Sequence, residues 1–279
     1  MKRELTLGYS PCPNDTFIFY ALTHDRISLP DTIIRERLED VETLNQLARK
    51  GALDLTKISY HAYGHLRDNY VLLRSGGALG RGCGPLVITS QPGISLTELQ
   101  GQPLAIPGEL TTANLLLQLC TGGFDQVIAM PFDQIMPAVI RGQVAAGVII
   151  HESRFTYQQF GLHQVIDLGA WWEEETGCPI PLGGILARRD LGSATIKAVE
   201  RAVSASLAYA WQHPDEPRGY IKQHAQELDD RVIEQHIGLY VNAFSSTLGV
   251  EGTKAVSTLF ERAEASGLLP KSVQPLFID

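Results

Sequence analysis

The sequence has no apolar run that approaches the roughly 18–20 residues of a membrane-spanning helix, and apolar stretches such as Leu115–Leu117 are short. The basic start at Lys2 and Arg3 is not followed by an apolar signal-peptide segment, so we expect a cytoplasmic protein. Basic residues are in deficit: 23 Lys and Arg stand against 31 Asp and Glu, a formal net charge of −8. Because binding to phosphate backbones requires surplus positive charge, we expect neither a membrane nor a nucleic acid as a partner.

Cysteine is scarce and scattered. The four residues are Cys12, Cys83, Cys120 and Cys178, without a C-x-x-C pair and without a nearby histidine at metal-ligand spacing. This pattern argues against a zinc site and against a disulfide framework. The glycine-rich segment 75–84 lacks the G-K-[ST] of a phosphate loop, and therefore favours a close approach or a hinge of the backbone. We expect no metal and no cofactor.

What the 279 residues do contain is an alternation of short β-rich runs with helical patterns. The predicted strands are 5–9, 32–38, 53–58, 70–74, 85–89, 103–107, 126–130, 145–150, 164–168 and 182–188, and helices follow at 193–213, 214–226, 230–241 and 252–265. This order predicts an α/β fold with largely parallel sheets. We predict two lobes, with residues 91–182 forming a small lobe inserted into a large lobe of residues 1–90 and 183–279.

Polar residues gather where predicted strands pass into helices. The four junctions are 10–16, 57–60, 108–113 and 151–154. Ligands of parallel α/β sheets bind beyond such strand ends, beside the free N–H groups of helix N-termini. Asn14 or Asp15 is predicted to cap the helix that follows, whereas Ser59 and Thr112 can cap a helix and still face a ligand. Lys57 is either an exposed charge at a strand end or a local cation beside a carboxylated ligand.

His151 is the most informative single residue, because the buried strand 145–150 delivers it to a sheet edge. Histidine has an unperturbed pKa of about 6.5, which suits proton transfer near neutrality. From position alone, a general base and a structural histidine bonded to a loop carbonyl both remain open. The other histidines of the helical and turn segments are predicted to lie on the surface; they are His24, His213, His224 and His236.

At these residues the sequence resembles a known family, the 1,4-dihydroxy-6-naphthoate synthases of the futalosine route to menaquinone. The most specific segments are SPCPNDTFIF (10–19), LEDVETLN (38–45), RSGGALG (74–80), IIHESRFTY (149–157) and DLGAWW (167–172). The resemblance implies a two-lobed fold like that of type II periplasmic solute-binding proteins, with the ligand in the cleft between the lobes. It further implies a lyase that converts cyclic dehypoxanthinylfutalosine to 1,4-dihydroxy-6-naphthoate and dihydroxyacetone without a metal or organic cofactor.

The resemblance also assigns residues. His151 matches the family's catalytic proton acceptor, and the substrate-contacting segments match Lys57, Ile58, Ser59, Thr112 and Ala113, with Asn45 in a further matching cleft segment. The expected partner is thus a small carboxylated substrate. Because the protein is acidic, long-range attraction cannot hold the carboxylate. We expect local donors to bind it, namely Lys57, the hydroxyl groups and the helix ends.

Three alternatives share this architecture. A solute-binding or sensor protein of the same fold has no need of a base in its cleft. A sister enzyme dehydrates chorismate on the same fold, but the SPCPNDT and His151 segments favour the naphthoate synthase. Porphobilinogen deaminase needs a cysteine that carries a covalent cofactor, and nothing in the sequence around Cys120 or Cys178 supports one.

Overall fold

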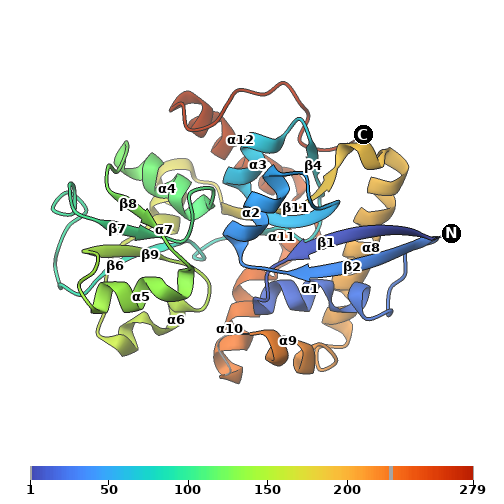
Figure 1. The fold of residues 1–279 in the computed structure, drawn as a ribbon, viewed down its shortest axis with the longest axis horizontal. Coiled ribbons are helices and arrows are strands. Elements are labelled where there is room, and N and C mark those ends of the chain that lie inside the picture. Colours follow the sequence, from blue (N-terminus) through green and yellow to red (C-terminus); the bar gives the residue numbers. More distant parts are fainter. Residues whose placement is uncertain (1, 226–228, 279) are drawn as a thin grey trace.

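The fold is described by a computed structural model of residues 2–225 and 229–278, which places the chain in two lobes, each built on its own β-sheet (Figure 1). The sheet of the first lobe has the strand order β2-β1-β3-β11-β4, with β5 paired to β11. Its strands are β1 (Arg3–Tyr9), β2 (Thr32–Leu38), β3 (Leu55–Ser59), β4 (Tyr70–Leu72), β5 (Ala78–Gly80) and β11 (Ile180–Arg188). Both ends of the chain lie in this lobe (Figure 1).

The sheet of the second lobe has the order β10-β6-β9-β7-β8. Its strands come from one continuous stretch of chain: β6 (Leu86–Thr89), β7 (Leu104–Ile106), β8 (Val127–Ala129), β9 (Ala146–Ile149) and β10 (His163–Asp167). The chain therefore enters the second lobe after β5 and returns to the first with β11. Strand β6, which precedes residue 90, pairs with β9 and β10 in the second sheet.

The prediction of largely parallel sheets is wrong. Strand β1 runs parallel to β2 and β3, and β7 runs parallel to β8 and β9. However, β11 is antiparallel to β3, β4 and β5, and β6 is antiparallel to β9 and β10. The reason lies in the crossings between lobes: β6 and β11 each enter a sheet from the side of the other lobe, whereas β1, β3, β7 and β9 run towards that side.

Helices flank both sheets. Around the first lie α1 (Pro13–Thr23), α2 (Val41–Arg49), α3 (Tyr60–Leu66), α8 (Ser193–Gln212), α9 (Arg218–His224), α10 (Asp230–Tyr240), α11 (Ala243–Ser246) and α12 (Gly249–Ala265); around the second lie α4 (Thr112–Thr121), α5 (Phe132–Ile140), α6 (Ser153–Thr156) and α7 (Leu168–Thr176). Two 3₁₀ turns, Tyr157–Phe160 and Arg189–Leu191, complete the set. The helix predicted over 214–226 is α9, and Gln226 lies outside the described residues. No helix in the described ranges has the length and apolarity to cross a membrane.

Local signals set the helix starts only in part. Asp40 caps α2 as its sequence position suggests, accepting hydrogen bonds from the backbone N–H groups of Glu42 and Thr43. The expected cap of α1 by Asn14 or Asp15 is wrong, because the helix begins at Pro13 and its N-cap is Cys12. Both side chains are thereby released from capping and point into a polar network at the lobe interface, described below.

The glycine-rich segment 75–84 permits a close approach of the backbone, one of the two uses predicted for it. A Cβ atom on Gly84 would lie 2.3 Å from the Cα atom of Gly169, at the start of α7. Any side chain at Gly84 would therefore push α7 away from the start of β6. The absence of a side chain at Gly84 therefore allows α7 to pack closely against the start of β6.

Candidate active site

A pocket lies between the two sheets, where the carboxyl ends of strands from both lobes meet. All four polar junctions predicted from the sequence contribute to its wall, together with helix α10. Of the residues that the resemblance assigned, the lining includes Lys57, Ile58, Ser59, Thr112, Ala113 and His151. Strand ends that are far apart in sequence thus form a single site, as expected for an α/β fold.

Asn45 is placed differently, behind the wall of the pocket. Its side chain is fully buried in α2, accepts a hydrogen bond from the backbone N–H of Ser59 at 3.1 Å and donates to Ser59 Oγ at 3.3 Å. Because Ser59 Oγ accepts from Asn45, its own hydrogen is left to donate towards the pocket. Asn45 therefore orients Ser59 rather than lining the cavity itself.

The N-terminus of α4 forms the opposing wall. Thr111 caps the helix, its hydroxyl accepting from the N–H of Asn114 at 3.3 Å. The hydroxyl of Thr112 donates to the carbonyl of Leu182 at 2.6 Å, so it is not a free donor for a ligand. The backbone N–H groups of Thr112 and Ala113, in the first turn of this ten-residue helix, are the donors that it leaves for an anion.

Lys57 does not present a free ammonium group. It is buried at the end of β3 and pairs with the buried carboxylate of Asp15, which also accepts from the hydroxyl of Ser10 at 2.7 Å. Among the described residues that line the pocket, only Lys57 and Asp15 carry a formal charge, and these two charges cancel. A carboxylate in the pocket must therefore be held mainly by neutral donors, that is, hydroxyl and backbone N–H groups.

His151 follows β9 at its carboxyl end and adopts a left-handed backbone conformation, with φ of 56°. Its Nδ1 lies 3.4 Å from the Sγ atom of Cys12, in the opposite lobe. Burial lowers the pKa of His151 to about 4, although the carboxylate of Asp15 opposes this shift. The imidazole is thus neutral at pH 7 and has one proton-free ring nitrogen that can accept a proton.

The structure places His236 in the site, and its predicted surface location is wrong. His236 lies on α10, is fully buried and lines the pocket together with Tyr240, one turn further along the helix. Its ring stacks on His151 with the ring centroids 6.2 Å apart. A signal was present in the sequence: Ile233, His236 and Tyr240 recur at helical spacing and form the buried face of α10.

Among the described residues, one group of side chains could share a metal ion. The ligand atoms of Cys12, His151 and Glu152 lie within 4.8 Å of one another. Burial and the neighbouring carboxylate of Glu152 raise the pKa of the Cys12 thiol well above its ordinary value. The thiol is therefore protonated at neutral pH, which disfavours metal ligation because metals bind the thiolate.

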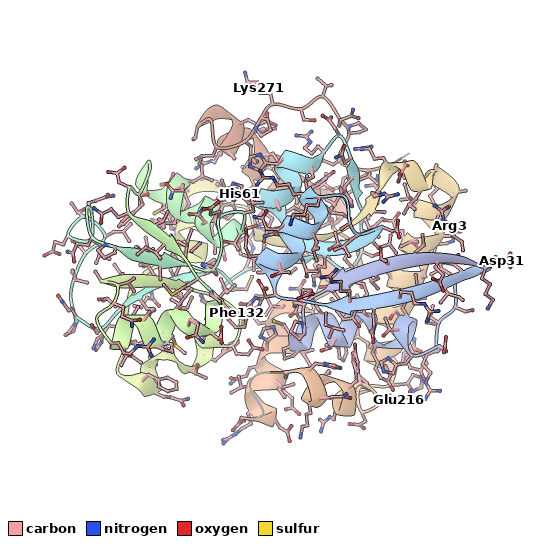
Figure 2. All side chains as sticks on the ribbon, viewed as in Figure 1. Arg3, Asp31, His61, Phe132, Glu216 and Lys271 are labelled. Atoms are coloured by element: carbon pink, nitrogen blue, oxygen red, sulfur yellow. The ribbon has the colours of Figure 1, made fainter. Side chains whose placement is uncertain are left out.

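The lobes touch beside the pocket through α3 and the residues before α4. Nδ1 of His61 lies 3.2 Å from the carbonyl oxygen of Thr111, and the backbone N–H of Leu110 donates to Glu42 at 3.2 Å. On the second lobe, the ring of Phe132 packs edge-on against His151 with centroids 4.9 Å apart. His61 and Phe132 accordingly appear where the two lobes face each other (Figure 2).

Comparison with known proteins identifies related sequences over almost the whole chain. A family model described as "Menaquinone biosynthesis" matches residues 5–265. A "1,4-dihydroxy-6-naphtoate synthase" of Thermus thermophilus is 57% identical over 98% of this chain and 99% of the relative. A protein of the same name from Streptomyces coelicolor is 47% identical, with 95% of each chain covered.

The fold itself recurs in solute-binding proteins. The alkanesulfonate-binding protein SsuA of Xanthomonas axonopodis pv. citri, solved with MOPS bound, superposes with a TM-score of 0.74 at 17% identity, covering 97% of this chain and 96% of that chain. At this identity the likeness concerns the fold alone. It confirms the predicted α/β, two-lobed, periplasmic-binding-protein-like architecture.

Proposed function

The chain belongs to the menaquinone-biosynthesis family of 1,4-dihydroxy-6-naphthoate synthases, and from this membership we propose that it converts cyclic dehypoxanthinylfutalosine to 1,4-dihydroxy-6-naphthoate with release of dihydroxyacetone. The observation that carries the proposal is the position of His151. A neutral, half-buried imidazole faces neutral anion donors across one pocket. This arrangement suits a lyase that removes a proton from a carboxylated substrate, and it requires no cofactor in the proposed reaction.

We assign the substrate carboxylate to the side of the pocket formed by Ser59 and the start of α4. The hydroxyl of Ser59 can donate to one oxygen, and the N–H groups of Thr112 and Ala113 can donate to the other. The dipole of α4 adds favourable electrostatics at its N-terminus. Lys57 and Ile58 line the adjoining wall, where the ion pair of Lys57 with Asp15 keeps the local charge near zero.

His151 is proposed as the general base. Its contact with Cys12 and the edge-on packing of Phe132 hold the ring in one orientation. A positioned base contributes about 10²–10⁴-fold to a rate. Formation of an aromatic naphthoate is itself downhill, so the enzyme has mainly to start proton removal and to keep the substrate oriented.

The experiment is a turnover assay with purified protein and cyclic dehypoxanthinylfutalosine in buffer containing a chelator. We expect naphthoate to form, which absorbance measurements would detect. Dihydroxyacetone should be released in equal amount, which mass spectrometry would measure. The variant His151→Asn should retain the fold, since asparagine tolerates the left-handed conformation, and should lose activity by about 10²-fold or more. His213→Asn, at an exposed position, is the matched control and should remain fully active.

Binding without turnover would instead favour a solute-binding role for this fold. Chorismate serves as the second assay substrate, because its dehydration would assign the chain to the sister activity. If His151→Asn retains wild-type turnover, His151 is not the base, even where the overall reaction is observed.

A further inference from the structure

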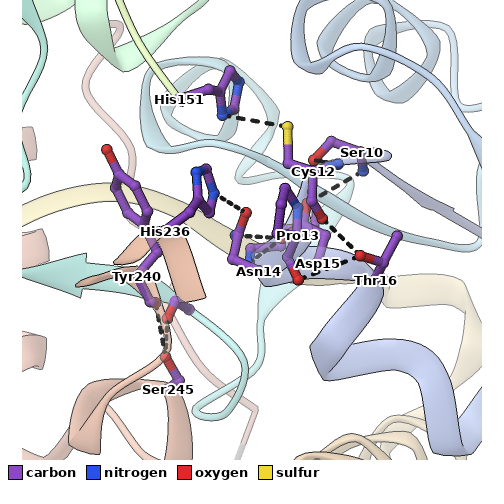
Figure 3. A network of polar contacts seen from close by, with 12 residues as sticks. Ser10, Cys12, Pro13, Asn14, Asp15, Thr16, His151, His236, Tyr240 and Ser245 are labelled. Carbon is purple, nitrogen blue, oxygen red and sulfur yellow. Dashed lines mark hydrogen bonds and ion pairs between the residues drawn. The ribbon is translucent and has the colours of Figure 1, made fainter. Parts of the chain in front are cut away.

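His236 occupies a position that the proposed reaction has not yet used. It is buried on α10 between Asn14 and the stacked ring of His151, and it forms part of the pocket wall. Figure 3 shows its ring beside Asn14, with His151 and Tyr240 nearby; all four residues line the pocket. A fully buried histidine at a ligand site needs an explanation, because imidazole carries two polar nitrogen atoms.

The hydrogen bonds of its neighbours determine which nitrogen of His236 carries the proton. Asp15 accepts from the ammonium of Lys57, and it also accepts from Asn14 Nδ2 at 2.7 Å. The amide oxygen of Asn14 must then be the atom that faces His236, at 2.8 Å from Nε2. Because an amide oxygen can only accept, Nε2 of His236 carries a hydrogen and donates it.

The second ring nitrogen follows from the first. Burial lowers the pKa of His236 well below its ordinary value, and the nearby His151 and Lys57 lower it further. The ring is therefore neutral, and with the hydrogen on Nε2 the Nδ1 atom holds a lone pair. This Nδ1 is buried and has no hydrogen-bond partner within residues 2–225 and 229–278. Figure 3 shows it turned away from Asn14, on the side of the ring towards Tyr240 and His151.

We propose that His236 is a substrate-binding residue whose Nδ1 accepts a hydrogen bond from a hydroxyl group of the bound substrate. An unpaired buried acceptor costs free energy, and a ligand hydroxyl in the pocket would remove that cost. The inference rests on the proposed function, whose three-carbon product dihydroxyacetone shows that hydroxyl groups accompany the part of the substrate that is cleaved off. Ser59 and α4 would then hold the carboxylate end, and His236 the hydroxyl-bearing end.

This assignment explains the series of hydrogen bonds that runs from Lys57 through Asp15 and Asn14 to His236. Each group fixes the orientation or tautomer of the next, so that the ring presents an acceptor and not a donor. A site built to pair with a hydroxyl discriminates strongly against analogues that lack it, because its buried acceptor is then left unpaired. His236 would thus set specificity for a polyol-derived substrate.

The test combines one spectroscopic and one kinetic measurement on the full chain. With ¹⁵N-histidine labelling, the Nδ1 resonance of His236, assigned by its loss in His236→Gln, should be that of an unprotonated nitrogen. It should shift on addition of dihydroxyacetone but not on addition of acetone, which has no hydroxyl. His236→Gln keeps a donor for Asn14, but its amide oxygen does not reproduce the position and direction of the Nδ1 lone pair. Its KM should therefore rise about 3- to 10-fold with a smaller change in kcat. Inhibition of this variant by 1,4-dihydroxy-6-naphthoate should be unchanged, because that product lacks the three-carbon fragment that His236 is proposed to bind.

Two outcomes overturn the assignment: an Nδ1 signal that is protonated or does not respond to dihydroxyacetone, or a His236→Gln variant with wild-type KM. The spectroscopic result is obtained on wild-type protein, so it holds even where the variant does not fold. It also does not depend on turnover. A responsive Nδ1 without naphthoate formation would therefore retain the hydroxyl site and reject the proposed reaction.

Discussion

Lys57 and Asp15 form an ion pair between β3 and α1, with exposed fractions of only 5% and 4%. The pair lies at the base of the pocket and anchors the hydrogen bonds that reach His236 through Asn14. Burying two charges costs free energy, which the pair recovers only while both partners are present. Removing either partner leaves the other charge uncompensated.

The variant Lys57→Met should therefore lower the free energy of unfolding at pH 7 by about 3–5 kcal/mol, measured by urea denaturation and circular dichroism. The double variant Asp15→Asn/Lys57→Met should recover much of this loss, because no unpaired charge remains. Lys50→Met, at an exposed position, is the control and should change stability by less than about 0.5 kcal/mol. A Lys57→Met protein as stable as the control would contradict a buried pair.

Asn45→Asp tests whether Asn45 acts through Ser59. An aspartate cannot donate to Ser59 Oγ; it would accept from the hydroxyl instead, turning its hydrogen away from the pocket. Such a change also places a negative charge near the proposed carboxylate site. We expect KM to rise about 10-fold or more, at a cost of roughly 1.4 kcal/mol, with kcat less affected.

The control for this prediction is Asn69→Asp, which makes the same chemical change at an exposed position and should leave KM unaltered. Steady-state kinetics on both variants provide the measurement. If Asn45→Asp lowers kcat and leaves KM unaltered, Asn45 supports the chemistry and not carboxylate binding.

How far the sequence predicts this molecule depends on the distance over which each signal acts. The cap of α2 by Asp40 was predictable, because the cap and the N–H groups that it binds lie within three residues. The role of Asp15 was not, because its partner Lys57 is 42 residues away and only the folded sheet brings them together. The same holds for the direction of β11, which follows from the path of the chain between lobes and not from local pattern.

His236 is the intermediate case. Its position on the buried face of α10 could have been found from the spacing of Ile233 and Tyr240. Its tautomer could not, because that depends on Asn14, from the opposite end of the chain. Likewise, the strand-to-helix junctions predicted that Ser59 and Thr112 would gather at one edge, but not that Thr112 would use its hydroxyl on Leu182.

The pH dependence of turnover should reflect the neutral state of His151. A general base acts only when unprotonated, so kcat/KM should fall as pH decreases through the pKa of His151 in the free enzyme. Because burial lowers that pKa to about 4, we expect kcat/KM to stay level from pH 8 to about 5. Assays across this range, with folding checked by circular dichroism, would instead show a decline centred near 6.5 if the imidazole were solvated.

The pH dependence of the unfolding free energy tests the contact that His61 makes between the lobes. Burial lowers its pKa from 6.5 to about 4, while the unfolded chain still binds a proton below pH 6.5. Between these values acid therefore favours unfolding, and the stability contributed by neutral His61 is lost as pH falls from 6.5 towards 4, by up to about 3 kcal/mol.

The variant His61→Asn should reduce this loss. Its amide nitrogen can replace Nδ1 as the donor to the carbonyl of Thr111, but asparagine does not titrate. Urea denaturation at pH 4.5 and pH 7 should therefore show a smaller difference in unfolding free energy for His61→Asn than for wild type. His213→Asn, at an exposed position, should retain the wild-type difference. Equal pH dependence in all three proteins would mean that His61 becomes protonated in the folded state as readily as in the unfolded chain, and that the contact with Thr111 does not keep it neutral.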